Sequence, residues 1–174
     1  MLSRRFVLYL FAVTCLFPRP LYAQRKIAVP ILKRLSQQAG YIFSGTVLSV
    51  ERLQPKVPND VAAVRITFRV DQAAKGVTAK QTFSIREWAG LWDHNERYRP
   101  GQHVLLFLYR SSKLGLTSPV GGDYGRYELD NSGRILGNPS RLEELQLKPP
   151  LSTSKKPVVN TRNLIRTLQR QGGE

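Results

Sequence analysis

The spacing of apolar residues changes near residue 41, and this change constrains the fold more than any other feature of the sequence. In residues 64–71 (VRITFRVD), four apolar side chains alternate with four polar ones. Such alternation places one face of a strand in a core and the other face in water. Turn signals then recur along the chain as far as residue 136, so we expect a mainly β domain over residues 41–137.

Other segments of this region also have the pattern of strands. Residues 41–53 (YIFSGTVLSVERL) change apolar parity at Gly45, and a glycine at such a point predicts a β-bulge or a sharp bend. Residues 104–109 (VLLFLY) are apolar on both parities and are expected to form the most buried strand. The remaining predicted strands are 82–88, 114–118 and 124–130, and a predicted turn at 130–133 (DNSG) leads into 134–136.

Helical spacing flanks the β domain on both sides. Residues 24–40 predict a short helix, in which Pro30 suits the first turn and Gly40 the C-terminal stop. Residues 138–174 read as a linker rich in Pro, Ser and Lys, followed by a short C-terminal helix that Asn160 can cap. The pattern leaves open whether this last helix docks on the domain.

The first 23 residues have the parts of a secretory signal peptide. An arginine pair precedes an apolar run of twelve residues at 6–17, and Ala23 offers a cleavage site. The run is shorter than the roughly 20 residues that span a bilayer, so we expect cleavage rather than a transmembrane span. A lipoprotein site at Cys15 is disfavoured by the bulky residue before it. The predicted mature chain therefore begins at Gln24 and is secreted or periplasmic.

Composition narrows the function classes. The chain carries 27 Lys and Arg against 12 Asp and Glu, for a formal net charge of +15. A single Cys and two His exclude a disulfide framework and a Cys-rich zinc site. Because the basic residues are spread along the whole chain, we interpret them first as a solvated surface that associates with anionic envelope polymers or acidic lipid headgroups.

Three short motifs, taken in order, carry a family resemblance. They are FSGTV at 43–47, an alternating strand that runs into DQAAKG at 71–76, and PGQ at 100–102 before the strand VLLF. This order resembles the netrin-like domains of tissue inhibitors of metalloproteinases and their bacterial relatives. The resemblance implies a five-stranded OB-type barrel with short flanking N- and C-terminal helices.

The inhibitory mechanism of that family does not carry over to this chain. The animal inhibitors chelate the zinc of their target protease with the amine and carbonyl of an N-terminal cysteine, which a disulfide holds in place. The expected mature terminus here is Gln24, and no cysteine follows it. Only the barrel and the extracytoplasmic setting are therefore implied by the resemblance.

The segment 87–99 (EWAGLWDHNERYR), called the aromatic loop below, holds both tryptophans of the chain. Large aromatic rings beside arginines suit contacts with sugars, bases or partner side chains. In the alternative interpretation, Trp88 and Trp92 plug the end of a small barrel. The candidate binding residues are Trp88, Trp92, Arg97, Tyr98 and Arg99, with Arg110 and Arg126 adding positive charge at the neighbouring rim.

Catalytic signals are weak. Asp93, His94 and Glu96, near His103 and Glu87, form the one cluster of acids and imidazoles, and its spacing matches no metal site. The serines near residue 111 lack a nucleophile-elbow context, and the glycine pair at 121–122 is not followed by the Lys-Ser or Lys-Thr of a phosphate loop. We therefore expect no enzyme activity, no cofactor and no metal.

These observations favour a secreted or periplasmic, non-enzymatic binding domain. It would recognise an extracytoplasmic protein or an anionic envelope polymer through the aromatic loop. The alternative is a single-stranded nucleic-acid-binding protein of the OB type, which an OB-type barrel with exposed aromatic rings and arginines supports and the predicted export disfavours. A hydrolase or metal enzyme built around His94 is the third hypothesis.

Overall fold

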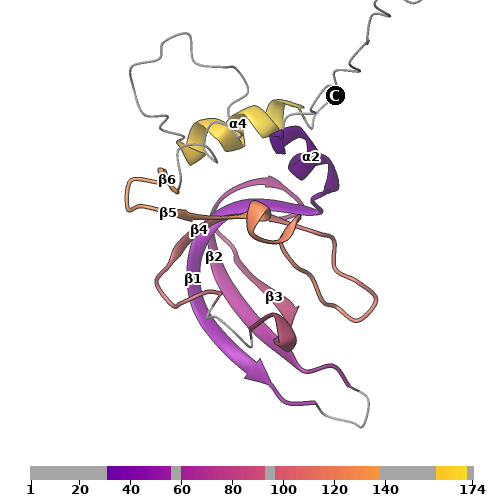
Figure 1. Cartoon of the computed structure of the whole chain (residues 1–174). Helices are drawn as coiled ribbons and strands as arrows, with labels where there is room; N and C mark the ends of the chain where they lie inside the picture. The colour runs from indigo at the N-terminus through magenta and orange to yellow at the C-terminus, as the bar shows by residue number, and fades with distance from the viewer. Residues whose placement is uncertain (1–30, 56–59, 93–96, 138–159, 172–174) are drawn as a thin grey trace, which may run out of the picture.

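The computed structural model describes residues 31–55, 60–92, 97–137 and 160–171 (Figure 1). The predicted signal peptide and the start of the predicted first helix lie outside these residues, as does most of the predicted linker. The fold is mainly β: one antiparallel sheet of six strands, with two helices lying against one of its faces (Figure 1). Neither helix among the described residues has the length and apolar character to cross a membrane.

The sheet has the strand order β3-β2-β1-β4-β5-β6, with every pair antiparallel. The strands are β1 (Tyr41–Leu53), β2 (Ala63–Lys75), β3 (Thr82–Trp88), β4 (His103–Leu108), β5 (Arg126–Leu129) and β6 (Ile135–Leu136). The predicted bounds 41–53 and 82–88 are thus confirmed. Figure 1 shows that the sheet is strongly curved, with β1 and β2 running through most of its length.

The expected five-stranded closed barrel is not what this pairing forms. The sheet has a sixth strand, and β3 and β6 are its edges, so no ladder joins β3 to β5. The physical reason is that β5 has only four residues, and the segment between β4 and β5 lies against β3 instead: the Thr117 N–H donates to the Arg86 carbonyl at 2.8 Å. We call the opening between β3 and β5 the seam.

Gly45 lies at the predicted bulge in β1. The pairing of β1 with β2 shifts register at this glycine and at two other points of the strand. A Cβ at position 45 would lie 2.4 Å from the backbone oxygen of Arg69, so the close approach of the two strands requires a glycine. The irregular register bends β1, and residues 42–47 are buried on both of its faces.

Two apolar clusters occupy the two faces of the central strands. Leu105 and Phe107 of β4 belong to the cluster beneath the helices, which we call the helix cluster. Val104, Leu106 and Leu108 belong to the other, the sheet cluster, together with residues of β1, β2 and β3. The prediction that 104–109 is apolar on both parities and deeply buried is therefore confirmed for the residues of β4.

The helices α2 (Ile31–Gln38) and α4 (Thr161–Gln171) complete the helix cluster. The first ends before Gly40, as predicted. The second is capped as predicted, because the Arg162 N–H donates to Asn160 Oδ1 at 2.9 Å. It also docks, since its apolar residues are buried and Gln169 Nε2 donates to the Ala73 carbonyl of β2 at 2.7 Å.

The predicted strand at 114–118 is wrong, and the one at 124–130 is only partly right. Around Gly115, which has a φ of 70°, the chain turns back on itself through a hydrogen bond from the Ser112 N–H to the Leu116 carbonyl. The short 3-10 helix η2 (Gly122–Gly125) takes up the start of the second segment. The predicted turn at 130–133 is confirmed, with the Gly133 N–H bonded to the Asp130 carbonyl at 3.0 Å.

Candidate functional site

The structure separates the predicted binding residues by burial. Trp92, in the 3-10 helix η1 (Ala89–Trp92), is 8% exposed and Tyr98 is 2% exposed, whereas Trp88 is 53% exposed. Arg99 and Arg110 are exposed, and Arg97 and Arg126 are half-buried. The burial favours the plug interpretation for Trp92 but contradicts it for Trp88, which is the exposed aromatic ring of the described part of the aromatic loop.

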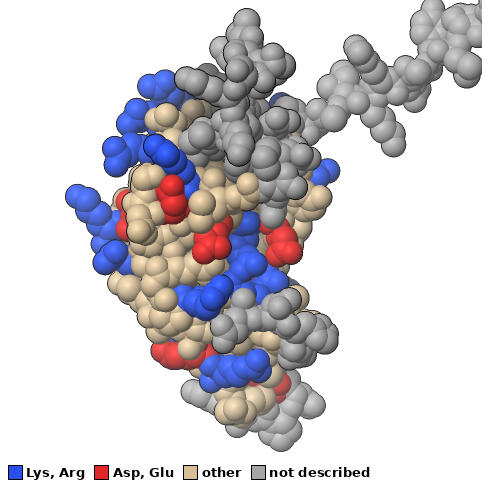
Figure 2. Space-filling model, turned by 60° about the vertical axis from the view of Figure 1, so that its left-hand side comes forward, with Lys and Arg blue, Asp and Glu red and all other residues tan. Residues whose placement is uncertain are grey.

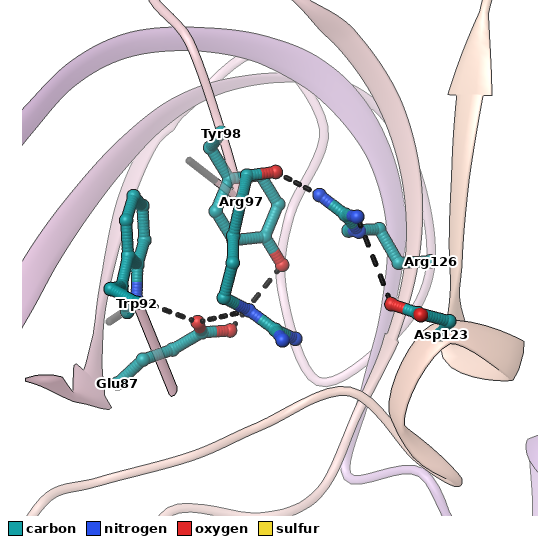
Figure 3. A network of polar contacts seen from close by, with 6 residues as sticks. All are labelled: Glu87, Trp92, Arg97, Tyr98, Asp123 and Arg126. Atoms are coloured by element: carbon teal, nitrogen blue, oxygen red, sulfur yellow. Dashed lines mark hydrogen bonds and ion pairs between the residues drawn. The ribbon is translucent and has the colours of Figure 1, made fainter. Parts of the chain in front are cut away.

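A buried carboxylate, Glu87, organises the aromatic loop from within. It follows Phe83 and Ile85 on the face of β3 that points into the sheet cluster, and it is 0% exposed. Its Oε2 accepts from Trp92 Nε1 at 3.2 Å and from Arg97 Nε at 3.1 Å, and its Oε1 accepts from the Tyr98 hydroxyl at 3.4 Å (Figure 3). The three donors satisfy a charge that would otherwise be costly to bury.

Burial governs the protonation of this cluster. It raises the pKa of Glu87 above the ordinary value of 4.5, while the Arg97 guanidinium and the hydrogen bonds from Trp92 and Tyr98 act in the opposite direction. Burial and the nearby Glu87 charge raise the pKa of Tyr98 well above its ordinary value of 10.0. At neutral pH the phenol therefore remains protonated and serves as a hydrogen-bond donor.

Arg126 extends the cluster across the seam (Figure 3). Its guanidinium carbon lies 5.4 Å from the centre of the Tyr98 ring, and its Nη1 donates to the Arg97 carbonyl. Its Nη2 lies 3.7 Å from a carboxylate oxygen of Asp123. The side chains of β3, the aromatic loop and β5 are thus joined by polar contacts at the place where a barrel would have been closed by strand pairing.

A pocket of about 350 Å³ opens beside this cluster. Its buried lining residues, Val64, Trp92 and Tyr98, make an apolar and aromatic floor, and its exposed ones include Arg52 and Arg99. Neither arginine forms an ion pair with any carboxylate that the structure describes. We call this site the arginine-rimmed pocket; it is lined by Val50, Arg52, Val64, Trp92, Tyr98, Arg99 and Pro100.

Sequence reasoning found three of these lining residues and missed the rest. Trp92, Tyr98 and Arg99 belong to the aromatic loop, whereas Arg52 comes from the far end of β1. No local signal marks Arg52, because only the bend of β1 brings that end of the strand to the loop. Trp88, Arg97, Arg110 and Arg126 do not line the pocket.

The predicted cluster of acids and imidazoles is only partly described. Asp93, His94 and Glu96 lie outside the described residues, Glu87 is committed to the buried cluster, and His103 is half-buried at the start of β4. Among the residues that the structure describes, no three His, Cys, Asp or Glu side chains are grouped so that they could hold a metal ion.

On the face shown in Figure 2, the basic side chains of the described residues do not form one continuous patch. Figure 2 shows Lys and Arg in several groups on the visible face, with acidic side chains among them. No protein-family model and no curated protein matches the chain. The function must therefore be argued from the site itself.

Proposed function

We propose that this protein is an exported, non-enzymatic binding domain that takes an acidic anchor residue of a partner protein into the arginine-rimmed pocket. One observation carries the proposal. Arg52 and Arg99 lie at a pocket with an aromatic floor, and no described carboxylate pairs with either of them.

The chemistry of the pocket fits an anchor with both an apolar and an anionic part. Guanidinium groups bind carboxylates through paired hydrogen bonds, and both Arg52 and Arg99 line this pocket. The apolar floor excludes water beneath the anion and favours an adjoining aliphatic or aromatic group. A volume of about 350 Å³ accommodates one or two side chains, which suits the anchor of a protein partner better than a long polymer.

The proposal includes a relationship to the netrin-like, OB-type fold. In an OB-type barrel the first strand pairs with the second and fourth strands, and the fifth closes against the third. The order β3-β2-β1-β4-β5 has the first of these features, and the seam lies where the closing pair is expected. The polar contacts from Glu87 through Arg97 to Arg126 support the view that the seam is a modified closure.

The single-stranded nucleic-acid alternative receives less support at this site. Binding of that kind uses exposed aromatic rings on which successive bases stack. Trp92 and Tyr98 are buried, so the described part of the aromatic loop offers only the exposed ring of Trp88. The third hypothesis, a hydrolase or metal enzyme, receives no support from the described residues, because His94 lies outside them.

Fluorescence anisotropy with labelled peptides tests the proposal on mature protein, whose first residue by N-terminal sequencing is expected to be Gln24. The probes are a peptide with Glu beside Phe, the same peptide with Gln in place of Glu, and a thymidine oligonucleotide. We expect the acidic peptide to bind at least tenfold more tightly than its Gln counterpart. The double variant Arg52→Ala/Arg99→Ala should remove most of that difference.

The matched control is Arg34→Ala/Arg134→Ala, which removes the same charge from two exposed residues that lie outside the pocket and form no ion pair with any described carboxylate. An equal loss in both double variants would show a general charge effect and would contradict the proposal. Tighter binding of the oligonucleotide than of the acidic peptide, with loss only in the pocket variant, would favour the nucleic-acid alternative instead.

A further inference from the structure

A second basic surface lies on helix α4, away from the arginine-rimmed pocket. Arg162, Arg166 and Arg170 recur every four residues and are all exposed. Residues four apart lie on the same side of a helix, so the three form a row, which we call the arginine row. The helix (TRNLIRTLQRQ) contains no acidic residue, and no ion pair joins the row to any carboxylate that the structure describes.

The folding of α4 does not account for this row. Like charges four residues apart destabilise a helix by a few tenths of a kcal/mol per pair. A cation near the N-terminus of a helix, where Arg162 lies, also opposes the helix dipole, although Arg170 in the last turn is favoured. Two pairs of like charges are therefore retained in a helix that would be more stable without them.

The packing of α4 fixes the orientation of the arginine row relative to the rest of the fold. The opposite side of α4 is buried in the helix cluster through Leu164, Ile165 and Leu168. The hydrogen bond from Gln169 to the Ala73 carbonyl and the Asn160 cap fix the rotation and the start of the helix. The three guanidinium groups are thus presented by a docked element of the fold rather than by a free tail.

A groove of about 240 Å³ runs between α4 and β2 beside the row. Arg162 and Arg166 line it, and Asp71 is the carboxylate among its described lining residues. That carboxylate has a partner of its own, because Arg69 Nε lies 3.7 Å from Asp71 Oδ1. The groove therefore offers two guanidinium groups and open space to an anion; it is lined by Asp71, Gln72, Ala73, Ala79, Arg162, Ile165, Arg166 and Gln169.

We infer that the arginine row and this groove bind a linear polyanion with a phosphodiester backbone. Four residues of helix rise about 6 Å, so the row presents three positive charges about 6 Å apart, over a total of about 12 Å. This repeat resembles that of neighbouring phosphates in an extended chain. All three residues are arginines, and the planar guanidinium fork suits phosphate oxygens.

A lipid surface fits these observations less well. A helix that lies in a membrane interface buries an apolar face among the lipids. The apolar face of α4 is already occupied by the helix cluster, so only its charged side is available. The occupant that fits an exported protein is a glycerol-phosphate polymer of a cell envelope, and single-stranded nucleic acid, which has the same phosphodiester chemistry, is the competing outcome of the test.

Anisotropy titrations of mature full-length protein over a range of salt concentrations test this inference. The probes are a thymidine dodecamer, a synthetic poly(glycerol phosphate) and heparin. Arg162→Gln/Arg166→Gln should weaken binding of the phosphodiester probes at least tenfold at low salt. It should also reduce the slope of log K against log salt by about 1.4, since each phosphate contact on a single strand contributes about 0.7.

The control Arg65→Gln/Lys113→Gln removes the same charge from exposed residues that do not line the groove, and it should weaken binding less than threefold. Arg162→Lys/Arg166→Lys keeps the charge and should lose at least threefold if the guanidinium fork matters. Equal losses in the Gln variant and its control, or binding to heparin alone, would overturn the inference. Tighter binding of poly(glycerol phosphate) than of the thymidine dodecamer supports the envelope polymer as the ligand, and the reverse order would overturn that choice in favour of nucleic acid.

Discussion

The arginines at the seam and the arginines of α4 contribute to the same net charge but differ in their burial and in their interaction partners. Arg97 is 15% exposed and bonds to Glu87, and Arg126 reaches the Arg97 carbonyl and lies over the Tyr98 ring. Those of the arginine row are exposed and pair with no described carboxylate. The charge of +15 is therefore of two kinds: some arginines make buried contacts within the fold, and others are exposed, without a described ion pair, and available to the anionic partner that we propose.

The strongest test of the seam is the removal of its largest buried ring. Trp92→Ala deletes a side chain that packs in the sheet cluster and donates to Glu87, so the free energy of unfolding should fall by about 3–5 kcal/mol. Trp88→Ala, at a ring that is 53% exposed, should cost less than about 1 kcal/mol. Urea denaturation measures both, and similar losses for the two tryptophans would contradict the assignment of Trp92 as the buried ring and Trp88 as the exposed one.

The removal of the buried carboxylate should rank next. Glu87→Ala leaves Trp92 Nε1, the Tyr98 hydroxyl and Arg97 without their common acceptor, and we expect a loss of about 2–4 kcal/mol. Denaturation of the exposed-residue variant Glu128→Ala provides the comparison, because that side chain has no ion pair among the described residues. A loss of under 0.5 kcal/mol for Glu87→Ala would show that the seam does not depend on this cluster.

The pH dependence of stability isolates the ionisation of Glu87. Burial raises its folded-state pKa above 4.5, so between 4.5 and that higher pKa the folded protein keeps a proton that the unfolded chain releases. This contribution to stability is complete below the unfolded pKa and is lost as the pH rises through the folded pKa. Measured against Glu87→Gln, the wild-type protein should therefore lose stability as the pH increases through this window.

Asp130 provides an internal check of opposite sign. Hydrogen bonds from the backbone and side chain of its own turn lower its pKa below 3.8. Measured against Asp130→Asn, the wild-type protein should lose stability as the pH falls through the folded-state pKa. The same trend in both comparisons would show that Glu87 is not the desolvated group.

The smallest expected effect on stability concerns the arginine row on α4. Arg166→Glu replaces two repulsive contacts on α4 with two attractive ones, toward Arg162 and Arg170. Thermal denaturation should show a gain of about 0.5–1 kcal/mol, while binding of phosphodiester probes is lost. A stabilised variant that no longer binds would mean that the arginine row is kept for its partner at the expense of the helix. A loss of stability would indicate a structural role for Arg166.

The local sequence pattern was sufficient to predict the bounds of two strands. The bounds predicted for β1 and β3 match those in the structure, and Gly45 marked the bulge correctly. The segment 114–118 also alternates, but Gly115 adopts a positive φ and the chain folds into a turn, so no strand forms. Alternation describes a strand only where a partner strand is present to pair with it.

The site depended on contacts that no local pattern contains. Glu87 shares a parity with Phe83 and Ile85, which does indicate that it points inward. Its three donors, however, lie 5 to 11 residues further along the chain and meet it only through the folding of the aromatic loop. The prediction of a closed barrel was wrong for a similar reason. Closure depends on the length of the last strands, and the sequence pattern alone does not give the ends of a strand as short as β5.

The segment between β4 and β5 has a consequence for association between copies of the chain. An edge strand such as β3 presents unpaired N–H and C=O groups on which a second molecule can add a strand, and this is a common route to aggregation. The Thr117 N–H occupies the Arg86 carbonyl on that edge, and the opposite edge, β6, is only two residues long. The segment between β4 and β5 therefore also covers part of the β3 edge against pairing with a second molecule. Shortening that segment would leave the edge open as a template for aggregation.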